Sequence, residues 1–458
     1  MIYLDHAAAT PLSRLARRAM EPFFSDQFFN PSAAYLPAQQ IHEIYEDAKS
    51  RLARLIGAKG GDLVITSGAT ESINLAFSLK PKHCLVLATE HAAVQAAAAP
   101  FSPKTIKVDR FGVIDLENFR TQLNSNTELI SISVANNELG TIQPLAEIAQ
   151  MIRQEKLRRQ KQGLTTPLYF HTDASQGFNL LKLNVAKFNI DLLTLNAAKM
   201  YGPKGIGALY VSRDIKLQPL ILGGGQERGL RSGTENVPAM MGFAAAAEDI
   251  IKHQDSNQQT YLKFKQIFQD ELKSLYPAPV FLGNPKCQLA NFCPLCFPDL
   301  DAERLIYKLE EHAVYVSTGA ACAASKGEPS HVLQAIGLSS QEIAGSLRVS
   351  FGALNNATNV KKAARIIRQV VTEERVRLWV APKPSTSACL VAWIPPLLPC
   401  FSNNKATKSP VFTWGIGARI SPAINALGLE ILPTPSASPS SSISTLKSGI
   451  LKPTTKPK

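Results

Sequence analysis

One lysine, Lys199, closes the apolar run DLLTLNAA, where a buried charge would be costly. Apolar surroundings lower the pKa of an amine, and a neutral amine is a nucleophile that forms Schiff bases. Asp173 follows the preceding candidate strand, in HTDASQ. A lysine Schiff base, with an aspartate opposite a pyridinium nitrogen, is the arrangement that holds pyridoxal 5'-phosphate (PLP). The simpler alternatives are a lysine that extends to water and an aspartate that caps the next turn.

Other polar motifs also follow candidate strands. SGATES (67–72) opens a helix whose free N–H groups suit a phosphate, and Thr70 offers both a hydroxyl and an amide. His91, in TEH, could stack on a planar ring or relay protons, and Gln176 could donate to a nearby oxygen. Each also has an ordinary explanation as a cap or a satisfied polar group. Because ligands bind at the carboxyl ends of strands in an open α/β sheet, we expect one crevice lined by SGATES, TEH, NNELG, DASQ and NAAK.

A second reactive group is Cys322, in STGAACAAS. Glycine, alanine and serine surround it, so the segment has little to pack and is predicted to be a mobile loop that presents a nucleophilic thiolate. Arg348, in SLRVSFG, lies on a late candidate strand and could bind a substrate carboxylate through two hydrogen bonds. The alternative for this arginine is a structural ion pair.

The elements that must position these residues alternate between strands and helices, which indicates βαβ units and a mostly parallel sheet. The predicted strands are Leu63–Thr66, Cys84–Thr89, Leu129–Ala135, Leu168–His171, Asp191–Leu195 and Gly207–Val211. The predicted helices between them are 37–56, 70–79, 91–99 and 144–162. A helical segment at 238–276, a helix at 300–312 and strand patterns near 289–297, 313–317 and 346–351 predict a second, smaller α+β domain.

Composition bounds the class of protein. The 458 residues are 45% hydrophobic and 19% charged, as in globular proteins, and the longest apolar runs fall short of a membrane span. Seven irregularly spaced cysteines indicate no disulfide framework, so we expect a cytoplasmic protein. The net charge of +13 is partly due to a basic tail, and the absence of basic runs interleaved with aromatics argues against nucleic-acid binding. The tail, 382–458, is rich in proline and serine and is predicted to be disordered and dispensable for catalysis.

Three cysteines raise the possibility of a metal site. Cys287, Cys293 and Cys296 have the spacing C-x5-C-x2-C, and CxxC pairs can bind zinc. QLANFCPLCF has a strand pattern, however, and no second Cys/His pair follows it closely. We therefore predict core cysteines on a strand and no metal.

Taken together, the motifs resemble the group I cysteine desulfurases, PLP enzymes of the class V aminotransferase family. The resemblance covers residues 1–375 in order, through YLDHAAATP, FFNPSAAY, SGATES, TEHAAV, NNELGTIQP, HTDASQ, KMYGPKGIGALY, GGGQERGLRSGTENV, STGAACAAS and LRVSFG. It implies PLP-dependent transferase fold type I, with a large domain at 12–250 around a seven-stranded sheet. A small domain would comprise 1–11 and 251–381.

The resemblance also implies a role for each residue. Lys199 would carry PLP, Asp173 would pair with the ring nitrogen, Gln176 would bind the phenolic oxygen, and His91 would stack on the ring and act in acid–base steps. The phosphate would be bound by Ala69 and Thr70, and by Thr234 from the second subunit of a homodimer. Substrate would be held by Asn137 and Arg348. Cys322 would take sulfur from L-cysteine as a persulfide, leave alanine, and pass the sulfur to an acceptor protein in iron–sulfur cluster assembly or tRNA thiolation.

One segment departs from the family. The residues before the PLP lysine are usually Ser-Gly-His, and here they are Asn196, Ala197 and Ala198. Asn196 can still donate a hydrogen bond to the phosphate, whereas Ala198 cannot. We therefore expect PLP to bind, but more weakly than is usual for the family.

Two other functions remain open at this point. Another class V PLP enzyme, an aminotransferase or a lyase, would share Lys199 and Asp173, and Cys322 argues against it. A degenerate paralogue that acts as a scaffold is suggested by Ala198, and the retention of the other site residues argues against that.

Overall fold

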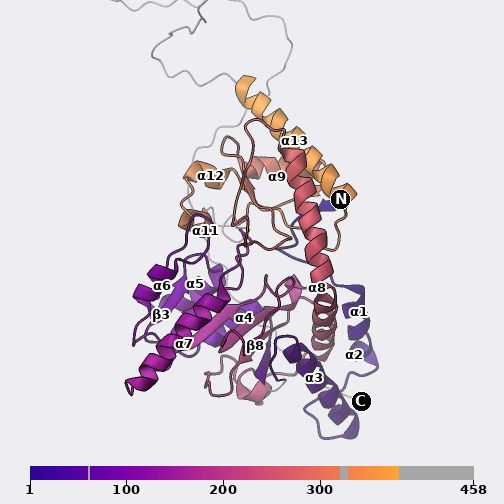
Figure 1. Cartoon of the computed structure of the whole chain (residues 1–458). Helices are drawn as coiled ribbons and strands as arrows, with labels where there is room; N and C mark the ends of the chain where they lie inside the picture. Colours follow the sequence, from indigo (N-terminus) through magenta and orange to yellow (C-terminus); the bar gives the residue numbers. More distant parts are fainter. Residues whose placement is uncertain (60–61, 320–328, 381–458) are drawn as a thin grey trace, which may run out of the picture. The chain divides into compact units, whose positions relative to one another are not determined.

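The computed structural model describes residues 1–59, 62–319 and 329–380 (Figure 1). The predictions for Cys322 and for the 382–458 tail concern residues outside these ranges.

A seven-stranded sheet forms the centre of the larger region, in the order β2-β8-β7-β6-β5-β3-β4. Four of the six neighbouring pairs are parallel, and β8 runs antiparallel to β7 and β2. The predicted mostly parallel α/β sheet is therefore confirmed. The strands are β2 (Leu63–Thr66), β3 (Cys84–Leu87), β4 (Lys104–Ile106), β5 (Leu129–Ser131), β6 (Tyr169–Asp173), β7 (Leu192–Asn196) and β8 (Gly207–Val211).

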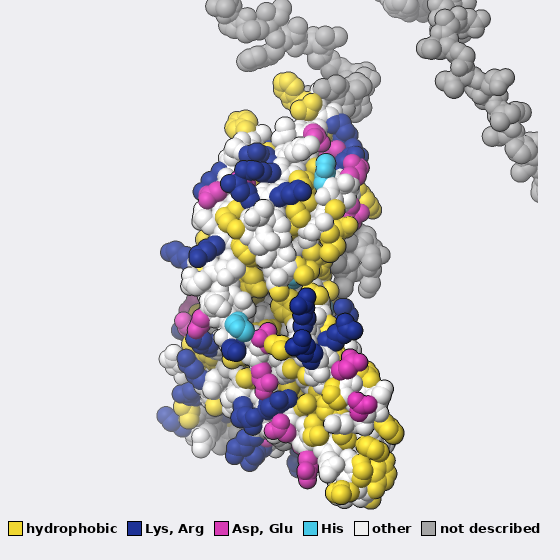
Figure 2. All heavy atoms as spheres, turned by 90° about the vertical axis from the view of Figure 1, so that its right-hand side faces the viewer, with side chains coloured by type: hydrophobic (Ala, Val, Ile, Leu, Met, Phe, Trp, Pro, Cys, Tyr) yellow, Lys and Arg dark blue, Asp and Glu magenta, His cyan; other side chains and the backbone are white. Residues whose placement is uncertain are grey.

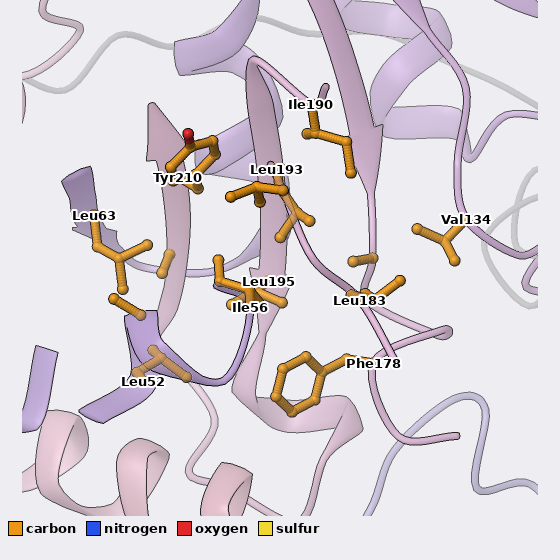
Figure 3. Packing of buried hydrophobic residues seen from close by; sticks show 14 of the residues in the cluster. Leu52, Ile56, Leu63, Val134, Phe178, Leu183, Ile190, Leu193, Leu195 and Tyr210 are labelled. Carbon is orange, nitrogen blue, oxygen red and sulfur yellow. The ribbon is translucent and has the colours of Figure 1, made fainter. Parts of the chain in front are cut away.

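Both faces of this sheet are covered, as the continuous apolar strands require. Successive residues of a strand point to opposite faces, and they enter two separate hydrophobic clusters. Leu63, Leu193 and Leu195 pack on one face with Leu52 of a helix and with Ile56, which follows that helix (Figure 3). Val64, Val86, Leu192 and Leu209 pack on the other face.

Helices flank the sheet and connect its strands. They are α1 (Arg14–Met20), α2 (Pro22–Ser25), α3 (Leu36–Arg54), α4 (Ala69–Phe77), α5 (Ala92–Ala98), α6 (Leu116–Gln122), α7 (Leu145–Lys161) and α8 (Val237–Leu272). The short 3-10 helices are η2 (Ala99–Phe101), η3 (Ala197–Lys199) and η4 (Glu227–Gly229). The four predicted helices agree with α3, α4, α5 and α7, whereas α6 and strand β4 were not predicted.

A second hydrophobic core lies in the C-terminal region. The long helix α8 links the two cores, because Met240 and Phe243 belong to the first and Phe264 and Phe268 to the second (Figure 1). The N-terminal strand β1 (Ile2–Tyr3) pairs in parallel with β11 (Val314–Tyr315). The remaining elements are β9 (Val280–Phe281), β10 (Leu295–Cys296), β12 (Ser346–Leu347), α9 (Ala302–Glu311), α11 (His331–Ala335), α12 (Ser340–Ala344) and α13 (Ala357–Val380).

The strand predicted near 289–297 is much shorter than expected. Only Leu295–Cys296 forms a strand, and an isolated bridge joins Phe292 to Ser350. Pro294, which has no N–H to donate, separates the two. Cys293 and Cys296 are buried, as predicted for core cysteines, but Cys287 is exposed, which corrects that part of the prediction.

One close backbone approach positions the start of α4. A β-carbon on Gly207 of β8 would lie 2.7 Å from the Cα and carbonyl carbon of Gly68 and 2.7 Å from the oxygen of Leu195. Gly68 itself has a φ of 154° and is the residue before the first turn of α4. Glycine at 207 therefore lets the start of α4 lie directly against the edge of β8.

We expect Gly207→Ala to lower the free energy of unfolding by about 1–3 kcal/mol, the usual cost of overpacking. Here the added methyl group meets backbone atoms, which cannot move aside cheaply. The measurement is urea denaturation. Gly224→Ala is the matched control, because its β-carbon would meet only the end of the Gln226 side chain, at 3.1 Å. Equal stabilities of the two variants would contradict this account of the contact.

Candidate active site

A cavity of about 420 Å³ lies where the central strands end. It is lined by Ala69 and Thr70 of SGATES, His91 of TEH, Asn137 and Glu138 of NNELG, Asp173 and Gln176 of DASQ, Asn196 and Lys199 of NAAK, and Arg348. Each motif follows the carboxyl end of a strand, so the fold brings them to one place, as expected. The roles assigned to the individual residues stay predictions.

Lys199 ends the short helix η3 and is half-buried. Its Nζ donates to the carbonyl oxygen of Ala7, at 2.8 Å, and to that of Ala8. The amine therefore lies beside the N-terminal segment, of which Ala7 and Ala8 also line the cavity. The apolar run before Lys199 is buried in the sheet, but the contacts of the amine itself are polar.

Asp173 is the last residue of β6 and is buried. Its Oδ1 accepts a hydrogen bond from the N–H of Ser175 at 2.8 Å. The side chain therefore does cap the following turn, which was the simpler explanation of this residue. That cap uses one oxygen of the carboxylate, and a carboxylate has further acceptor capacity for a ligand in the cavity.

His91 is the residue before α5, and its Nδ1 accepts the N–H of Ala93 at 3.1 Å. Burial lowers the pKa of His91, and the negative charge of Asp173 opposes this shift. A neutral imidazole that accepts at Nδ1 carries its proton on Nε2. His91 thus combines a fixed ring position with a defined tautomer, which suits a residue that stacks on a ring or moves a proton.

The phosphate-binding features lie at the start of α4. Gly68 precedes the helix and provides no side-chain cap, so the first N–H groups are available to an anion. Asn196 lies on the cavity wall, and its Oδ1 accepts the N–H of Ala198 at 3.1 Å. This contact orients the side-chain amide, whose NH2 group is a donor. The donor set fits a phosphate even though Ala198 provides no side-chain donor.

Gln176 and Arg348 are also held by the N-terminal segment. Nε2 of Gln176 donates to the oxygen of Ala7 at 3.0 Å. Nη2 of Arg348 pairs with Oδ1 of Asp5 at 2.7 Å, so the structural ion pair considered for this arginine exists. Nη1 of Arg348 donates to the oxygens of Gly319 (2.8 Å) and Asn137 (3.1 Å). Nε of Arg348 is buried and has no hydrogen-bond partner among the described residues, which leaves a donor for a ligand.

Four site residues were not predicted. Asp5 pairs with Arg348, and Glu138 and His331 line the cavity. Glu90 is fully buried directly before His91, and its Oε1 accepts the N–H of Ser133 at 2.5 Å. Nε2 of His331 donates to the backbone oxygen of Glu90 at 2.8 Å. Their signal was in the sequence, because three of the four stand within the quoted motifs YLDHAAATP, TEHAAV and NNELGTIQP.

Thr234 was predicted to bind the phosphate of a partner subunit, and Cys322 was predicted to accept the sulfur. Thr234 is exposed and does not line the cavity, and Cys322 is outside the described residues. Within the described ranges, no cluster of three or more His, Cys, Asp or Glu side chains could hold a metal ion, and no helix is long and apolar enough to span a membrane.

Glu90 gives the stability of the protein a distinct pH dependence. Burial raises the pKa of its carboxyl from 4.5 to about 8. The folded protein thus holds a proton that the unfolded chain releases, so the free energy of unfolding falls as pH rises from about 4.5 to about 8. One such group contributes about 1.4 kcal/mol per pH unit. We expect Glu90→Gln to make the dependence between pH 6.5 and 8 shallower.

Urea denaturation at several pH values measures this slope. Glu155→Gln is the control, because hydrogen bonds from arginines lower the pKa of Glu155, which is ionised in both states above pH 6.5. Parallel slopes for the wild type and Glu90→Gln would contradict the assignment.

Comparison with known proteins shows which family the chain belongs to. The aminotransferase class-V model matches residues 2–363. Cysteine desulfurase IscS 1 of Archaeoglobus fulgidus is 35% identical and aligns with 82% of this chain and 98% of that protein. Cysteine desulfurase IscS of Methanosarcina thermophila is 35% identical and aligns with 83% of this chain and 95% of that protein.

Solved structures agree with this result. A NifS-like protein matches with a TM-score of 0.74 and 27% identity, over 81% of this chain and 99% of that one. SspA in complex with cysteine matches with a TM-score of 0.65 and 34% identity, over 77% of this chain and 99% of that one. The chain therefore belongs to the aminotransferase class-V family, whose PLP-dependent cysteine desulfurases it resembles over nearly their full length.

Proposed function

We propose that this protein is a PLP-dependent cysteine desulfurase that converts L-cysteine to L-alanine and transfers the sulfur to Cys322 as a persulfide. The observation that carries the proposal is the convergence of Lys199, Asp173 and His91 on one cavity that also holds an uncapped helix N-terminus and Arg348. The relatives named as cysteine desulfurases support the same reaction.

The residues present fit PLP. The cofactor supplies an electron sink that makes the C–S bond of a bound amino acid breakable. Lys199 would hold it covalently, and the carboxylate of Asp173 would keep the ring nitrogen protonated. The first N–H groups of α4, at Ala69 and Thr70, would bind the phosphate together with Asn196. Gln176, which has a second amide hydrogen beyond the one given to Ala7, would donate to the phenolic oxygen.

Two further residues would handle the substrate. Arg348 would bind the substrate carboxylate through Nε, the donor without a protein partner, and the adjacent Nη2. Asn137 is half-buried in the same wall and would contribute its side-chain amide. His91 would stack over the ring and move protons through its imidazole.

Cys322 would accept the sulfur. It lies three residues beyond Gly319, which lines the cavity. The thiolate would attack the sulfur of L-cysteine and the C–S bond would break. Cys322 would keep the sulfur as a persulfide, while the electron pair of the broken bond and a proton would go to the former Cβ, which leaves as the methyl group of alanine. An iron–sulfur scaffold or a tRNA-thiolation relay would be the acceptor.

A homodimer is part of the proposal. Large hydrophobic side chains are exposed from α2 to the start of α3, among them Phe24 (60%), Phe28 (66%) and Leu36 (66%). Figure 2 shows hydrophobic side chains gathered on the lower part of the face that carries these helices. Exposed apolar clusters of this kind are typical of subunit interfaces. The exposed Thr234 would then reach the phosphate of the partner subunit.

The chemistry of the described cysteines fits a reducing, cytoplasmic setting. Cys84, Cys287, Cys293 and Cys296 are all free thiols. Burial raises the pKa of Cys293 to about 12 and that of Cys84 to about 11, so these two remain protonated at neutral pH and are poor nucleophiles.

The proposal is tested by measuring alanine and sulfide from L-cysteine in the presence of a reductant. We expect both products from the wild type in equal amounts. Cys322→Ala should lose at least about 100-fold in sulfide release yet retain the absorbance of bound PLP, because its cofactor site is intact. Lys199→Ala should fail to retain PLP through gel filtration.

Cys287→Ala is the matched control, since Cys287 is an exposed cysteine that does not line the cavity. An amino-group transfer product in place of alanine and sulfide would point to another class V enzyme instead.

We also expect PLP to bind the wild type with a dissociation constant above about 1 µM. Loss of one charge-assisted contact costs about 1.5–3 kcal/mol, or about 10- to 100-fold in affinity. Ala198→His should recover part of this loss, whereas Asn196→Ala should weaken binding further. Titration of the cofactor-free protein, followed by absorbance, measures the three constants. Sub-micromolar affinity of the wild type would contradict this expectation, and the lack of any absorbance change in excess PLP would favour a non-catalytic paralogue.

A further inference from the structure

A glutamate directly follows the two residues proposed to bind the cofactor phosphate. Glu71 lies in the first turn of α4, next to Thr70, and its side chain is 13% exposed. Its Oε2 accepts the N–H of Ser67 at 2.7 Å, so the carboxylate closes the turn that leads into the helix. A negative charge in the first turn stabilises a helix. This one also lies within one residue of the N–H groups that would bind a phosphate dianion, and like charges repel each other.

Arg231 compensates the charge of this carboxylate. Its Nε donates to Oε1 of Glu71 at 3.2 Å, and the arginine side chain is 28% exposed. Both oxygens of Glu71 therefore have a donor, one from the backbone of its own turn and one from a distant loop. Within the described ranges, no other basic side chain pairs with Glu71. Removal of Arg231 would thus leave an uncompensated negative charge beside the phosphate-binding turn.

The loop that carries Arg231 is attached to the edge of the central sheet by Glu227. Oε2 of Glu227 accepts the N–H of Ile65 in the edge strand β2 at 2.9 Å, and Oε1 accepts the hydroxyl of Tyr45 at 2.7 Å. Nζ of Lys49 pairs with the same carboxylate at 3.2 Å, and the lysine and glutamate side chains are only 5% and 4% exposed. Buried polar groups with satisfied partners rigidify the structure around them, so this carboxylate holds the loop against the sheet.

The backbone of the loop has a defined shape. Glu227 and Arg228 have φ values of 49° and 60°, in the left-handed region that costs free energy for residues other than glycine. Such a conformation persists where the surrounding contacts impose it. Arg231 itself forms an isolated bridge with Ile221. Because the arginine extends from an ordered backbone, its pairing with Glu71 costs less conformational entropy than it would from a free loop.

We propose that Arg231 is a positioning residue for the cofactor phosphate, which neutralises Glu71 and keeps the first turn of α4 able to bind a dianion. The inference rests on the proposed PLP-dependent function and deepens it. Arg231 does not line the cavity, so it would act through Glu71 and not by touching the phosphate. The effect should be specific for the phosphate group. Pyridoxal has the same ring and aldehyde as PLP but no phosphate, and its binding should not depend on Arg231.

The test compares the wild type with Arg231→Gln, Glu71→Gln and the Glu71→Gln/Arg231→Gln double variant. The cofactor-free proteins are titrated with PLP and with pyridoxal, and binding is followed by absorbance. We expect Arg231→Gln to bind PLP about 10-fold more weakly, because the uncompensated carboxylate repels the phosphate. Glu71→Gln alone should bind PLP no more weakly than the wild type. Pyridoxal affinity should change less than about twofold in all three variants.

The double variant gives the sharpest prediction. A glutamine at position 71 has no charge, and its amide oxygen can still accept the N–H of Ser67. The double variant should therefore bind PLP at least about fivefold more tightly than Arg231→Gln, although it lacks one more native side chain. A residue that only stabilises the fold would not produce this recovery.

Arg213→Gln is the matched control. Arg213 also pairs with one carboxylate through Nε, that of Asp62 at 3.3 Å, and it does not line the cavity. Its affinities for PLP and pyridoxal should equal those of the wild type. A readout independent of the cofactor is urea denaturation of the cofactor-free proteins, in which Arg231→Gln and Arg213→Gln should have similar midpoints.

Three results would overturn the inference. Unchanged PLP affinity in Arg231→Gln would remove the role. Equal losses of PLP and pyridoxal affinity, together with a lowered urea midpoint, would mean that Arg231 only stabilises the fold. A double variant that binds PLP no better than Arg231→Gln would mean that the arginine does not act through Glu71. Failure of the proposed function has a different signature, because the wild type itself would then show no absorbance change with PLP.

Discussion

The ion pair between Asp5 and Arg348 is the interaction on which the geometry of the cavity depends. It joins the first residues of the chain to a late strand at 2.7 Å, and the Arg348 side chain is only 5% exposed. Removal of one partner of such a pair leaves the other charge buried and uncompensated, which typically costs about 3–5 kcal/mol. Beside the pair, the oxygen of Ala7 accepts from both Gln176 and Lys199. The N-terminal segment therefore connects the end of the central sheet with the C-terminal region, and the cavity exists only where these parts meet.

The carboxylates in and around the cavity differ in their surroundings. Asp5 is compensated by Arg348, and Asp173 has the N–H of Ser175 as a donor. Glu90 is fully buried, and its pKa of about 8 keeps it neutral at pH 7. If Glu90 were ionised, it would compete with Asp173 for the interaction with a protonated nitrogen in the cavity. A neutral Glu90 leaves Asp173 as the group that can keep a heterocyclic nitrogen protonated.

Much of this was predictable from the sequence because the relevant signals are local. The strands LVIT and GALYV are apolar runs of four and five residues that were placed at their exact bounds. Lys199, Asp173 and His91 follow such runs, and the rule for strand ends is enough to bring them together.

The features that were not predicted from the sequence depend mainly on contacts between distant segments. Asp5 reaches Arg348 because the N-terminal segment pairs with distant segments. Strand β1 pairs with β11, and Asp5 itself pairs with Ser350, two residues from Arg348. Glu138 gained its partner from Ser330, far along the chain, and no local pattern contains that pairing. Strand β4 was missed because its first two residues are exposed and the apolar signal is weak. The environment of the Lys199 amine was also predicted incorrectly. The apolar run before Lys199 suggested apolar surroundings, but the amine donates to backbone carbonyl oxygens.

At the phosphate end of the cavity, alanine at position 198 leaves phosphate binding to other hydrogen-bond donors. With alanine at 198, the donors available within one subunit are neutral: the first N–H groups of α4, the hydroxyl of Thr70 and the amide of Asn196. Neutral donors bind a dianion less strongly than a charged imidazole does. Any donor from a second subunit, such as the exposed Thr234, then carries a larger share of the binding free energy. In the proposed homodimer, cofactor binding and subunit association would therefore stabilise each other, because a ligand stabilises every state that binds it.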